Sequence, residues 1–240
     1  MVLKPLAVAV ALAAVTTPLC AQESSWIVSL GFRGSLTTTA KLFYLPEDPS
    51  EFLRSRFEPL KNIPGAALDA RVRPPGSSFF FTLSAEYQRK TLEQRQLLGF
   101  TSPPSVLPTE DGYWMIPIEA TVNVDVPLGA ERFALTMGAG FGVYYAERLL
   151  SVAGIPATPV DVTPALGLTV RTSADYRLTD WVTVLMELRF RNPQITTVNR
   201  FEQKSTTVDG VVIVFPQEDI PGRLGIEGMV VSLGVVVDLR

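Results

Sequence analysis

The residues of this sequence that could do chemistry are arginines and carboxylates placed at every second position of several segments. Glu86 and Glu119 are a pair of carboxylates of the kind that can serve in general acid–base catalysis. Arginines such as Arg189 and Arg191 follow the same alternating pattern, and charges shielded from water are stable only when they are paired. The pattern therefore favours an internal ion-pair network over a catalytic site. The residues assigned to this network are Arg33, Asp69, Arg71, Arg73, Glu86, Glu119, Asp125, Arg171, Asp175, Glu187, Arg189, Arg191 and Asp238.

Composition excludes several other kinds of chemistry. The 240 residues include no histidine, which removes His-based catalytic triads and His metal sites. No Walker, Rossmann, EF-hand or zinc-ligand spacing is present, so we expect no cofactor, no metal and no enzyme activity. The formal net charge of −3 argues against binding to nucleic acid.

The amino end has the order of a secretory signal peptide. Lys4 supplies a positive charge, residues 5–15 are apolar and small, and a short polar stretch leads to Ala21. We expect residues 1–21 to be removed by cleavage after Ala21, and residues 22–240 to form one domain. An uncleaved anchor and lipidation at Cys20 are the alternatives. After cleavage the chain would be an exported protein without cysteine, stabilised by burial or by a membrane.

The rest of the chain alternates with a period of two, which is typical of β-strands. Eight segments show it: 26–35, 66–73, 79–90, 113–126, 133–145, 163–176, 182–191 and 228–239. Short connections (74–78, 127–132 and 177–181) alternate with long ones (36–65, 91–112, 146–162 and 192–227). This rhythm predicts an antiparallel up-and-down sheet with its short turns at one end and its long loops at the other.

One face of these segments carries essentially no charge, and two folds fit that pattern. A soluble barrel would bury the apolar face, whereas a transmembrane barrel would turn it toward lipid. Three features favour the membrane: several segments reach the roughly 9–11 residues that cross a bilayer, turns and loops alternate in length, and aromatic residues mark the strand ends. The aromatic girdles are expected to contain Trp26, Phe133, Tyr176 and Trp181 at the periplasmic level, and Tyr87, Trp114, Tyr145 and Phe190 at the outer level. We therefore predict an all-β protein, an eight-stranded antiparallel up-and-down transmembrane β-barrel.

Local features refine this prediction. Pro117 and Pro164 fall inside expected strands and each removes a donor from the hydrogen-bond ladder, which predicts bulges there. A run of glycines at 138, 140 and 142 is expected to make room for long arginines on the facing wall, with a small passage or ligand cleft as the alternative. Residues 206–215 alternate as well, and we expect them to pair with residues 196–203 in an extracellular hairpin. Entry of that hairpin into the bilayer would give ten strands.

The alternation and the loop rhythm resemble the small bacterial outer-membrane barrels of the OmpA/OmpX type, over nearly the whole mature chain. The resemblance implies a place in the outer membrane, contact with its lipid and lipopolysaccharide, and delivery by the barrel-assembly machinery. Outer-membrane phospholipases, lipid A deacylases and omptin-like proteases share a catalytic histidine, so this chain is not expected to be one of them.

An eight-stranded barrel has an interior that side chains can fill. The sequence thus favours a plugged polar lumen, with a structural role in the envelope or an interaction with an extracellular partner through the long loops. A porin-like narrow channel for small solutes is the first alternative, and a soluble periplasmic, lipocalin-like barrel that binds an apolar ligand is the second.

Overall fold

The computed structural model describes residues 26–98, 105–129, 131–208 and 210–239. The predicted signal peptide, residues 1–21, and its cleavage site lie outside these ranges. Most described residues lie in β-strands, and the helix α1 (Glu51–Arg54) is a single turn. Within the described ranges, no helix is long and apolar enough to cross a membrane.

Thirteen strands make up the described fold. Their bounds are β1 (Ile27–Phe43), β2 (Phe57–Arg73), β3 (Phe79–Leu98), β4 (Ser105–Val126), β5 (Phe133–Val152), β6 (Ile155–Thr163), β7 (Ala165–Arg177), β8 (Val182–Arg191), β9 (Gln194–Phe201), β10 (Ser205–Val208), β11 (Val211–Val214), β12 (Ile220–Gly225) and β13 (Met229–Leu239).

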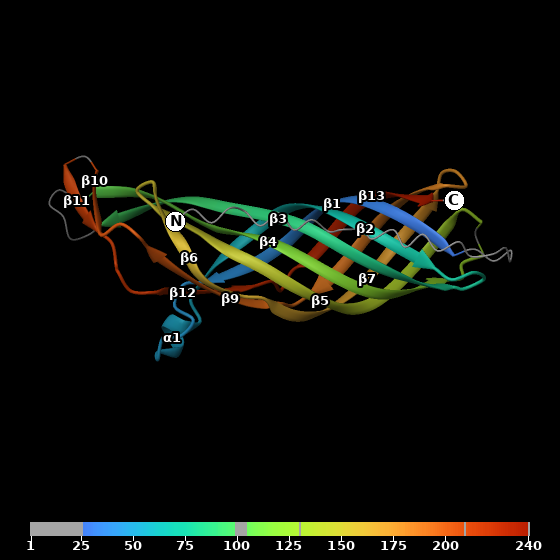
Figure 1. Cartoon of the computed structure of the whole chain (residues 1–240), viewed down its shortest axis with the longest axis horizontal. Helices are drawn as coiled ribbons and strands as arrows, with labels where there is room; N and C mark the ends of the chain where they lie inside the picture. Colours follow the sequence, from blue (N-terminus) through green and yellow to red (C-terminus); the bar gives the residue numbers. More distant parts are fainter. Residues whose placement is uncertain (1–25, 99–104, 130, 209, 240) are drawn as a thin grey trace, which may run out of the picture.

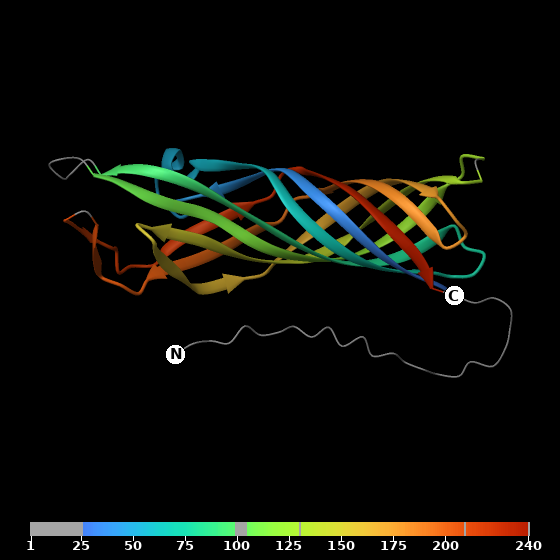
Figure 2. The same cartoon turned by 90° about the horizontal axis from the view of Figure 1, so that it is seen from above.

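The long strands close into a ring of eight, in the order β1–β2–β3–β4–β5–β7–β8–β13 and back to β1. Every pairing in the ring is antiparallel. Figures 1 and 2 show the result as an elongated cylinder of tilted strands. The turns after β2, β4 and β7 gather at one end of it, which we call the short-turn end, whereas α1 and the β10–β11 hairpin lie toward the opposite end, the loop end (Figure 1).

Alternation along each strand sends charged residues inward and apolar residues outward in the half of the barrel nearer the short turns. On β1, Arg33 is completely buried while the adjacent Phe32 is 61% exposed. On β8, Glu187 is completely buried while Met186 is 53% exposed. A soluble barrel would have the opposite arrangement, with the apolar face hidden from solvent.

The strands extend far beyond their predicted ends. Most residues of the predicted long loops therefore lie in strands, and the prediction of those loops is wrong. β4 has 22 residues and β5 has 20, and the predicted loop 146–162 is instead strand around a tight turn at Ala153 and Gly154. The reason is that polarity inverts toward the loop end: Leu42, Leu60 and Ile195 point inward and are buried there. The contrast between an uncharged outward face and a charged inward face therefore ends before the strands do.

Three of the eight long strands are broken in two, at Pro164, at Asn192–Pro193 and at residues 226–228. Beyond these breaks β6, β9 and β12 replace β7, β8 and β13, and β12 pairs with β1. The predicted bulge at Pro117 is wrong, because β4 keeps its register with both neighbours, but its pairing with β3 is interrupted between Ala85–Ile118 and Gln88–Met115. Pro164 lies between β6 and β7 rather than inside a strand, and the register shift of β6 falls between Pro159 and Asp161.

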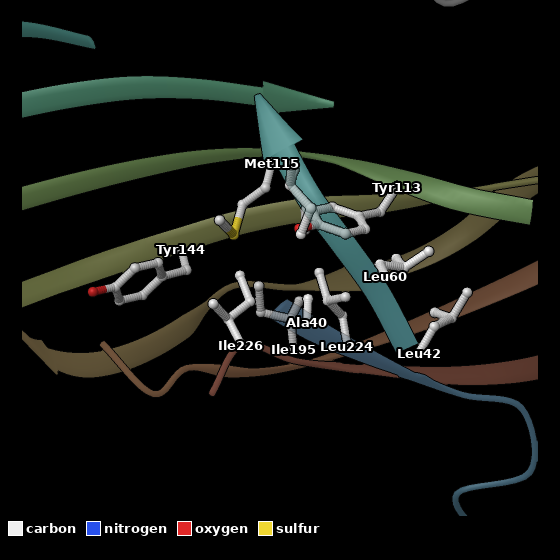
Figure 3. Close-up of a cluster of buried hydrophobic side chains, with 11 residues drawn as sticks. Ala40, Leu42, Leu60, Tyr113, Met115, Tyr144, Ile195, Leu224 and Ile226 are labelled. Atoms are coloured by element: carbon white, nitrogen blue, oxygen red, sulfur yellow. The ribbon is translucent and has the colours of Figure 1, made fainter. Parts of the chain in front are cut away.

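The lumen nearer the loop end is filled by an apolar cluster, shown in Figure 3. Tyr113 and Met115 from β4 and Tyr144 from β5 pack there against aliphatic side chains of β1, β2, β9 and β12. The buried members are Ala40, Leu42, Leu60, Ile63, Tyr113, Met115, Tyr144, Ala146, Ile195, Leu224 and Ile226. Hydrophobic burial thus stabilises this part of the interior, whereas the part nearer the short turns is filled mainly by charged side chains.

The predicted pairing of residues 206–215 with 196–203 is also wrong. β10 pairs with β11 in a small hairpin of its own, and β9 pairs with β6 and β12. Ile213 and Phe215 pack with Phe201 at the loop end, where the Phe201 and Phe215 rings stack with centroids 4.6 Å apart. The hairpin therefore caps the loop end of the barrel and adds no strand to the ring.

Candidate functional site

The lumen beside the apolar cluster holds the predicted charged residues in two groups. We call the first the central cluster; it contains Arg33, Asp69, Glu86, Glu119, Arg171, Glu187, Arg189 and Arg191. We call the second the vestibule cluster; it lies nearer the short-turn end and contains Arg71, Arg73, Asp125, Asp175 and Asp238.

Arg33 on β1 joins a carboxylate from the adjacent strand β2 to one from β8, which is separated from β1 by β13 alone. Its Nε donates to Oδ2 of Asp69 at 2.6 Å and its Nη2 donates to Oδ1 at 2.7 Å, a two-pronged contact. Its Nη1 donates to Glu187, and Ser84 completes the set by donating to Oδ1 of Asp69 at 2.6 Å. Strands β1, β2, β3 and β8 are thereby tied together through the interior.

Glu187 is the centre of the central cluster because three arginines converge on it. In addition to Arg33, Nη2 of Arg171 lies 2.7 Å from its Oε2, and Nη2 of Arg189 donates to its Oε1 at 2.6 Å. All four side chains are essentially buried. A buried charge of this kind is stable only when its partners are buried with it. The pairing is not ideal throughout, because Oε2 of Glu187 and Nη2 of Arg171 are close but form no hydrogen bond.

Glu86 and Glu119, the two carboxylates considered for acid–base chemistry, are occupied as ion-pair acceptors. Nη1 of Arg189 donates to Oε2 of Glu119 at 2.5 Å, and Nη1 of Arg191 donates to Oε2 of Glu86 at 2.9 Å. The hydroxyl of Tyr144 donates to Oε1 of Glu119 at 2.7 Å. With their oxygens held by arginine and hydroxyl donors, these carboxylates act as structural acceptors in this arrangement.

The vestibule cluster surrounds a cavity of about 340 Å³ at the short-turn end. Arg73 pairs with Asp125 at 2.5 Å, whereas the contact of Arg71 with Asp175 is longer, at 3.4 Å. Oδ1 of Asp238 accepts a hydrogen bond of 2.6 Å from Ser29. The predicted set of charged residues is therefore not one continuous network.

Sequence reasoning missed the pair of Arg148 and Asp111, because both fell in predicted loops. Arg148 grips Asp111 with two hydrogen bonds, of 2.9 Å from Nε and 2.6 Å from Nη2, near the loop end of the lumen. The signal that could have found the pair is the period of two itself: Arg148 shares the inward parity of Gly142 and Tyr144 on β5. Asn199 was missed for the same reason; it is buried and donates to the carbonyl of Arg148 at 3.2 Å.

The glycines of β5 have a different role from the predicted one. A Cβ on Gly140 would lie 1.9 Å from the carbonyl oxygen of Ala120, and one on Gly138 would lie 2.1 Å from Oδ1 of Asn123. The crowding atoms belong to the adjacent strand β4, not to arginines on the facing wall. Glycine is needed here because β4 and β5 approach each other closely.

The predicted aromatic residues lie on the outer surface, at two levels. Tyr87, Trp114 and Tyr145 form a row across β3, β4 and β5, with ring centroids 6.5 Å and 5.3 Å apart. Nε1 of Trp114 and the hydroxyl of Tyr145 both donate to Glu147, on the loop-end side of the row. Near the short turns, Phe133 and Tyr176 are paired across β5 and β7, and Trp26 and Trp181 are exposed. Phe190 on β8 is also exposed.

Charge is balanced within the barrel. The described residues that are buried include six arginines and six acids, and these are Arg33, Arg71, Arg148, Arg171, Arg189, Arg191, Asp69, Glu86, Asp111, Glu119, Asp175 and Glu187. No group of three or more Asp, Glu or Cys side chains among the described residues could hold a metal ion. The arrangement is suited to holding strands together through a desolvated interior.

No family model and no curated protein matches this chain. Among solved structures, the outer membrane protein OprG from Pseudomonas aeruginosa is similar with a TM-score of 0.55 and 10% identity, covering 90% of this chain and 97% of that one. Neisserial surface protein A is similar with a TM-score of 0.45 and 15% identity, covering 90% and 99%, respectively. Ail of Yersinia pestis is similar with a TM-score of 0.43 and 12% identity, covering 91% and 100%.

The similarity to OprG is one of fold, and it confirms the all-β, eight-stranded antiparallel architecture predicted from the period of two. The resemblance to small bacterial outer-membrane barrels is thereby confirmed at the level of fold: this chain has the architecture of a small outer-membrane β-barrel protein.

Proposed function

We propose that this chain is an integral outer-membrane barrel with a closed polar lumen, which supports the envelope and presents its loop end at the cell surface. The observation that carries the proposal is the exposed apolar belt around a buried, charge-balanced interior. Leu68, Phe141 and Leu233 are each more than 60% exposed on the outside of the ring. Contiguous apolar surface on this scale is stable in lipid and would cause a soluble protein to aggregate.

The belt also has a height that suits a bilayer. On β3 it runs from Phe79 to the girdle residue Tyr87, and on β4 from Val126 to the girdle residue Trp114. These spans of nine and thirteen residues bracket the roughly 9–11 residues of a tilted transmembrane strand. Glu147 receives the polar tips of Trp114 and Tyr145 at one boundary, as expected where a ring lies in lipid and its polar atom meets the headgroups.

A closed lumen is supported by the burial of its side chains. Arg33 and Arg189 are 0% and 1% exposed, which supports a lumen packed with side chains at this level. The apolar cluster that contains Tyr113 and Met115 fills the next layer of the interior. A barrel of eight strands leaves an interior about wide enough for side chains alone, which agrees with this filling.

The loop end supports a role at the surface. Phe52 on α1 is 79% exposed and Val214 on β11 is 76% exposed, and both lie beyond the apolar belt. Exposed apolar side chains at a loop tip are suited to contact with another molecule. In this proposal the belt contacts outer-membrane lipid and lipopolysaccharide, the barrel-assembly machinery inserts the chain, and no reaction is catalysed.

Three measurements on the expressed protein test the proposal. We expect the protein to fractionate with the outer membrane, to migrate faster on gels before boiling than after it, and to give no steady conductance in planar bilayers. Defined single-channel steps would instead show a porin-like channel. Release by osmotic shock without detergent would show a soluble periplasmic barrel and would contradict the membrane assignment.

A further inference from the structure

The cavity at the short-turn end is lined by equal numbers of arginines and acids, but its most deeply buried arginine is incompletely paired. Four arginines contribute to its lining: Arg71, Arg73, Arg132 and Arg177. Its volume of about 340 Å³ lies at the lower end of the roughly 300–1,000 Å³ found for small-molecule sites. The central cluster does not use this space, because its own carboxylates and arginines are paired with one another.

Arg71 is buried to more than nine-tenths but is incompletely paired. Its Nη1 makes only the 3.4 Å contact with Asp175, and its Nε and Nη2 have no hydrogen-bond partner. This Nε–Nη2 edge is the one with which Arg33 grips Asp69 and Arg148 grips Asp111. Leaving such donors unpaired costs free energy, so an oxyanion that reaches this edge would be bound favourably.

The other three arginines line the same cavity, Arg73 beside Arg71 and the remaining two at the rim. The guanidinium of Arg73 lies over the ring of Phe80 at 4.6 Å, and that of Arg71 lies 5.6 Å from the same ring, so one aromatic side chain positions both. Arg132 and Arg177 are adjacent at the rim, where the backbone N–H of Arg177 donates to the carbonyl of Arg132 at 2.8 Å. Both rim side chains are exposed.

The acids of the cavity are mostly engaged. Asp125 accepts from Arg73 and from the hydroxyl of Thr136, and Asp238 accepts from Ser29. Glu131 is exposed at the rim, and Oδ1 of Asp175 has no hydrogen-bond partner. Asp175 is therefore the side chain that competes most directly with an incoming anion for Arg71.

We propose that this cavity binds a small oxyanion, a carboxylate or phosphate group, held by Arg71 at its base and by Arg132 and Arg177 at its rim. The binding itself is independent of the proposed membrane function. Only the source of the ligand rests on the proposed function. If the loop end lies at the cell surface, the short-turn end faces the periplasm. The anion is then either a free periplasmic solute or a carboxylate of the cell-wall peptide.

The test is isothermal titration calorimetry of the whole protein in non-ionic detergent, with inorganic phosphate and citrate as probes. The variant R132Q/R177Q changes only exposed rim residues, and we expect it to bind at least about tenfold more weakly, since each charge-assisted contact is worth that much. R54Q, which removes an exposed arginine of α1, is the matched control and should bind as the unaltered protein does.

A second variant is expected to change the affinity for the probes in the opposite direction. D175N removes the competing negative charge beside Arg71, so we expect tighter binding of the same probes. A structural role for Asp175 alone would not increase affinity, and the characteristic gel shift of the folded barrel shows that the variant has folded. The proposal is overturned if the probes give no saturable binding, or if the rim variant and R54Q bind them equally.

The two sources of the ligand are distinguished with a soluble muropeptide and its amidated form. Tighter binding of the muropeptide than of citrate, lost when its carboxylates are amidated, identifies the cell wall as the source. Saturable binding of phosphate or citrate without that preference identifies a free solute. A barrel that fails to fractionate with the outer membrane would contradict the proposed function while leaving the calorimetric result unaffected.

Discussion

Arg189 on β8 and Glu119 on β4 meet across the lumen, with 2.5 Å between Nη1 and Oε2, although 70 residues separate them in the chain. The same guanidinium also donates to Glu187 on its own strand. Opposite walls of the ring are thus joined by one buried arginine, which makes the interior a structural element in its own right.

Replacing Glu187 by Gln should destabilise the barrel strongly. The change keeps the shape of the side chain but leaves Arg33, Arg171 and Arg189 without their shared carboxylate. Breaking a buried ion pair by removing one partner costs about 3–5 kcal/mol, because the remaining charge stays buried. Urea unfolding of the protein in lipid vesicles measures this loss in the free energy of unfolding.

The matched control is Asp219→Asn, which breaks the pair with Arg200 at the surface. Both of those side chains are about half exposed, and such pairs contribute only about 0–1 kcal/mol. Equal losses in the two variants would contradict the structural role of the central cluster.

Replacing Leu233 by Arg should impair membrane insertion. Leu233 is 65% exposed in the middle of the apolar belt on β13, next to Met186 of β8. A charge at this depth costs about 2–4 kcal/mol on the lipid face of a barrel. The measurement is the yield of heat-modifiable protein in the outer-membrane fraction. Phe52→Arg, on α1 beyond the belt, should insert normally, and normal insertion of both variants would show that the belt does not face lipid.

Replacing Gly140 by Ala should weaken the pairing of β4 with β5. The added Cβ would meet the carbonyl oxygen of Ala120, a backbone atom that cannot move away without disturbing the ladder. We expect a loss of at least roughly 1–3 kcal/mol in the free energy of unfolding. Gly34→Ala is the control, since nothing lies within 4 Å of a Cβ there and the change should stay within about 0.5 kcal/mol. An unchanged unfolding midpoint for Gly140→Ala would rule out this close approach.

The three tryptophans should all report shallow positions in the bilayer. Trp114 lies in the row of aromatic residues toward the loop end, and Trp26 and Trp181 lie near the short turns. Single-tryptophan variants in vesicles made with lipids brominated at different depths measure the position of each ring by fluorescence quenching. Stronger quenching by bromines at the bilayer centre than by bromines near the headgroups would contradict the two girdles.

Much of the fold could be predicted because, in the half of the barrel nearer the short turns, each strand alternates charged and apolar residues with a period of two. Charged residues such as Arg33 and Glu187 alternate with apolar residues such as Phe32 and Met186, and this period of two is visible in the sequence without any knowledge of partners. The short turns at 74–78 and 127–132 were predicted correctly for the same reason, since they interrupt that alternation with proline and glycine.

The sequence by itself therefore determined the strands in the half of the barrel nearer the short turns, the inward set of charges and the outward apolar face, because each depends on local alternation. Only the tertiary structure decided which arginine meets which acid, because those contacts depend on ring closure and register between strands far apart in the chain. It also decided the length of the strands. Toward the loop end many inward residues are apolar, with Arg148 and Asp111 as exceptions, so the strands continue although the alternation of charged and apolar faces that predicts them does not.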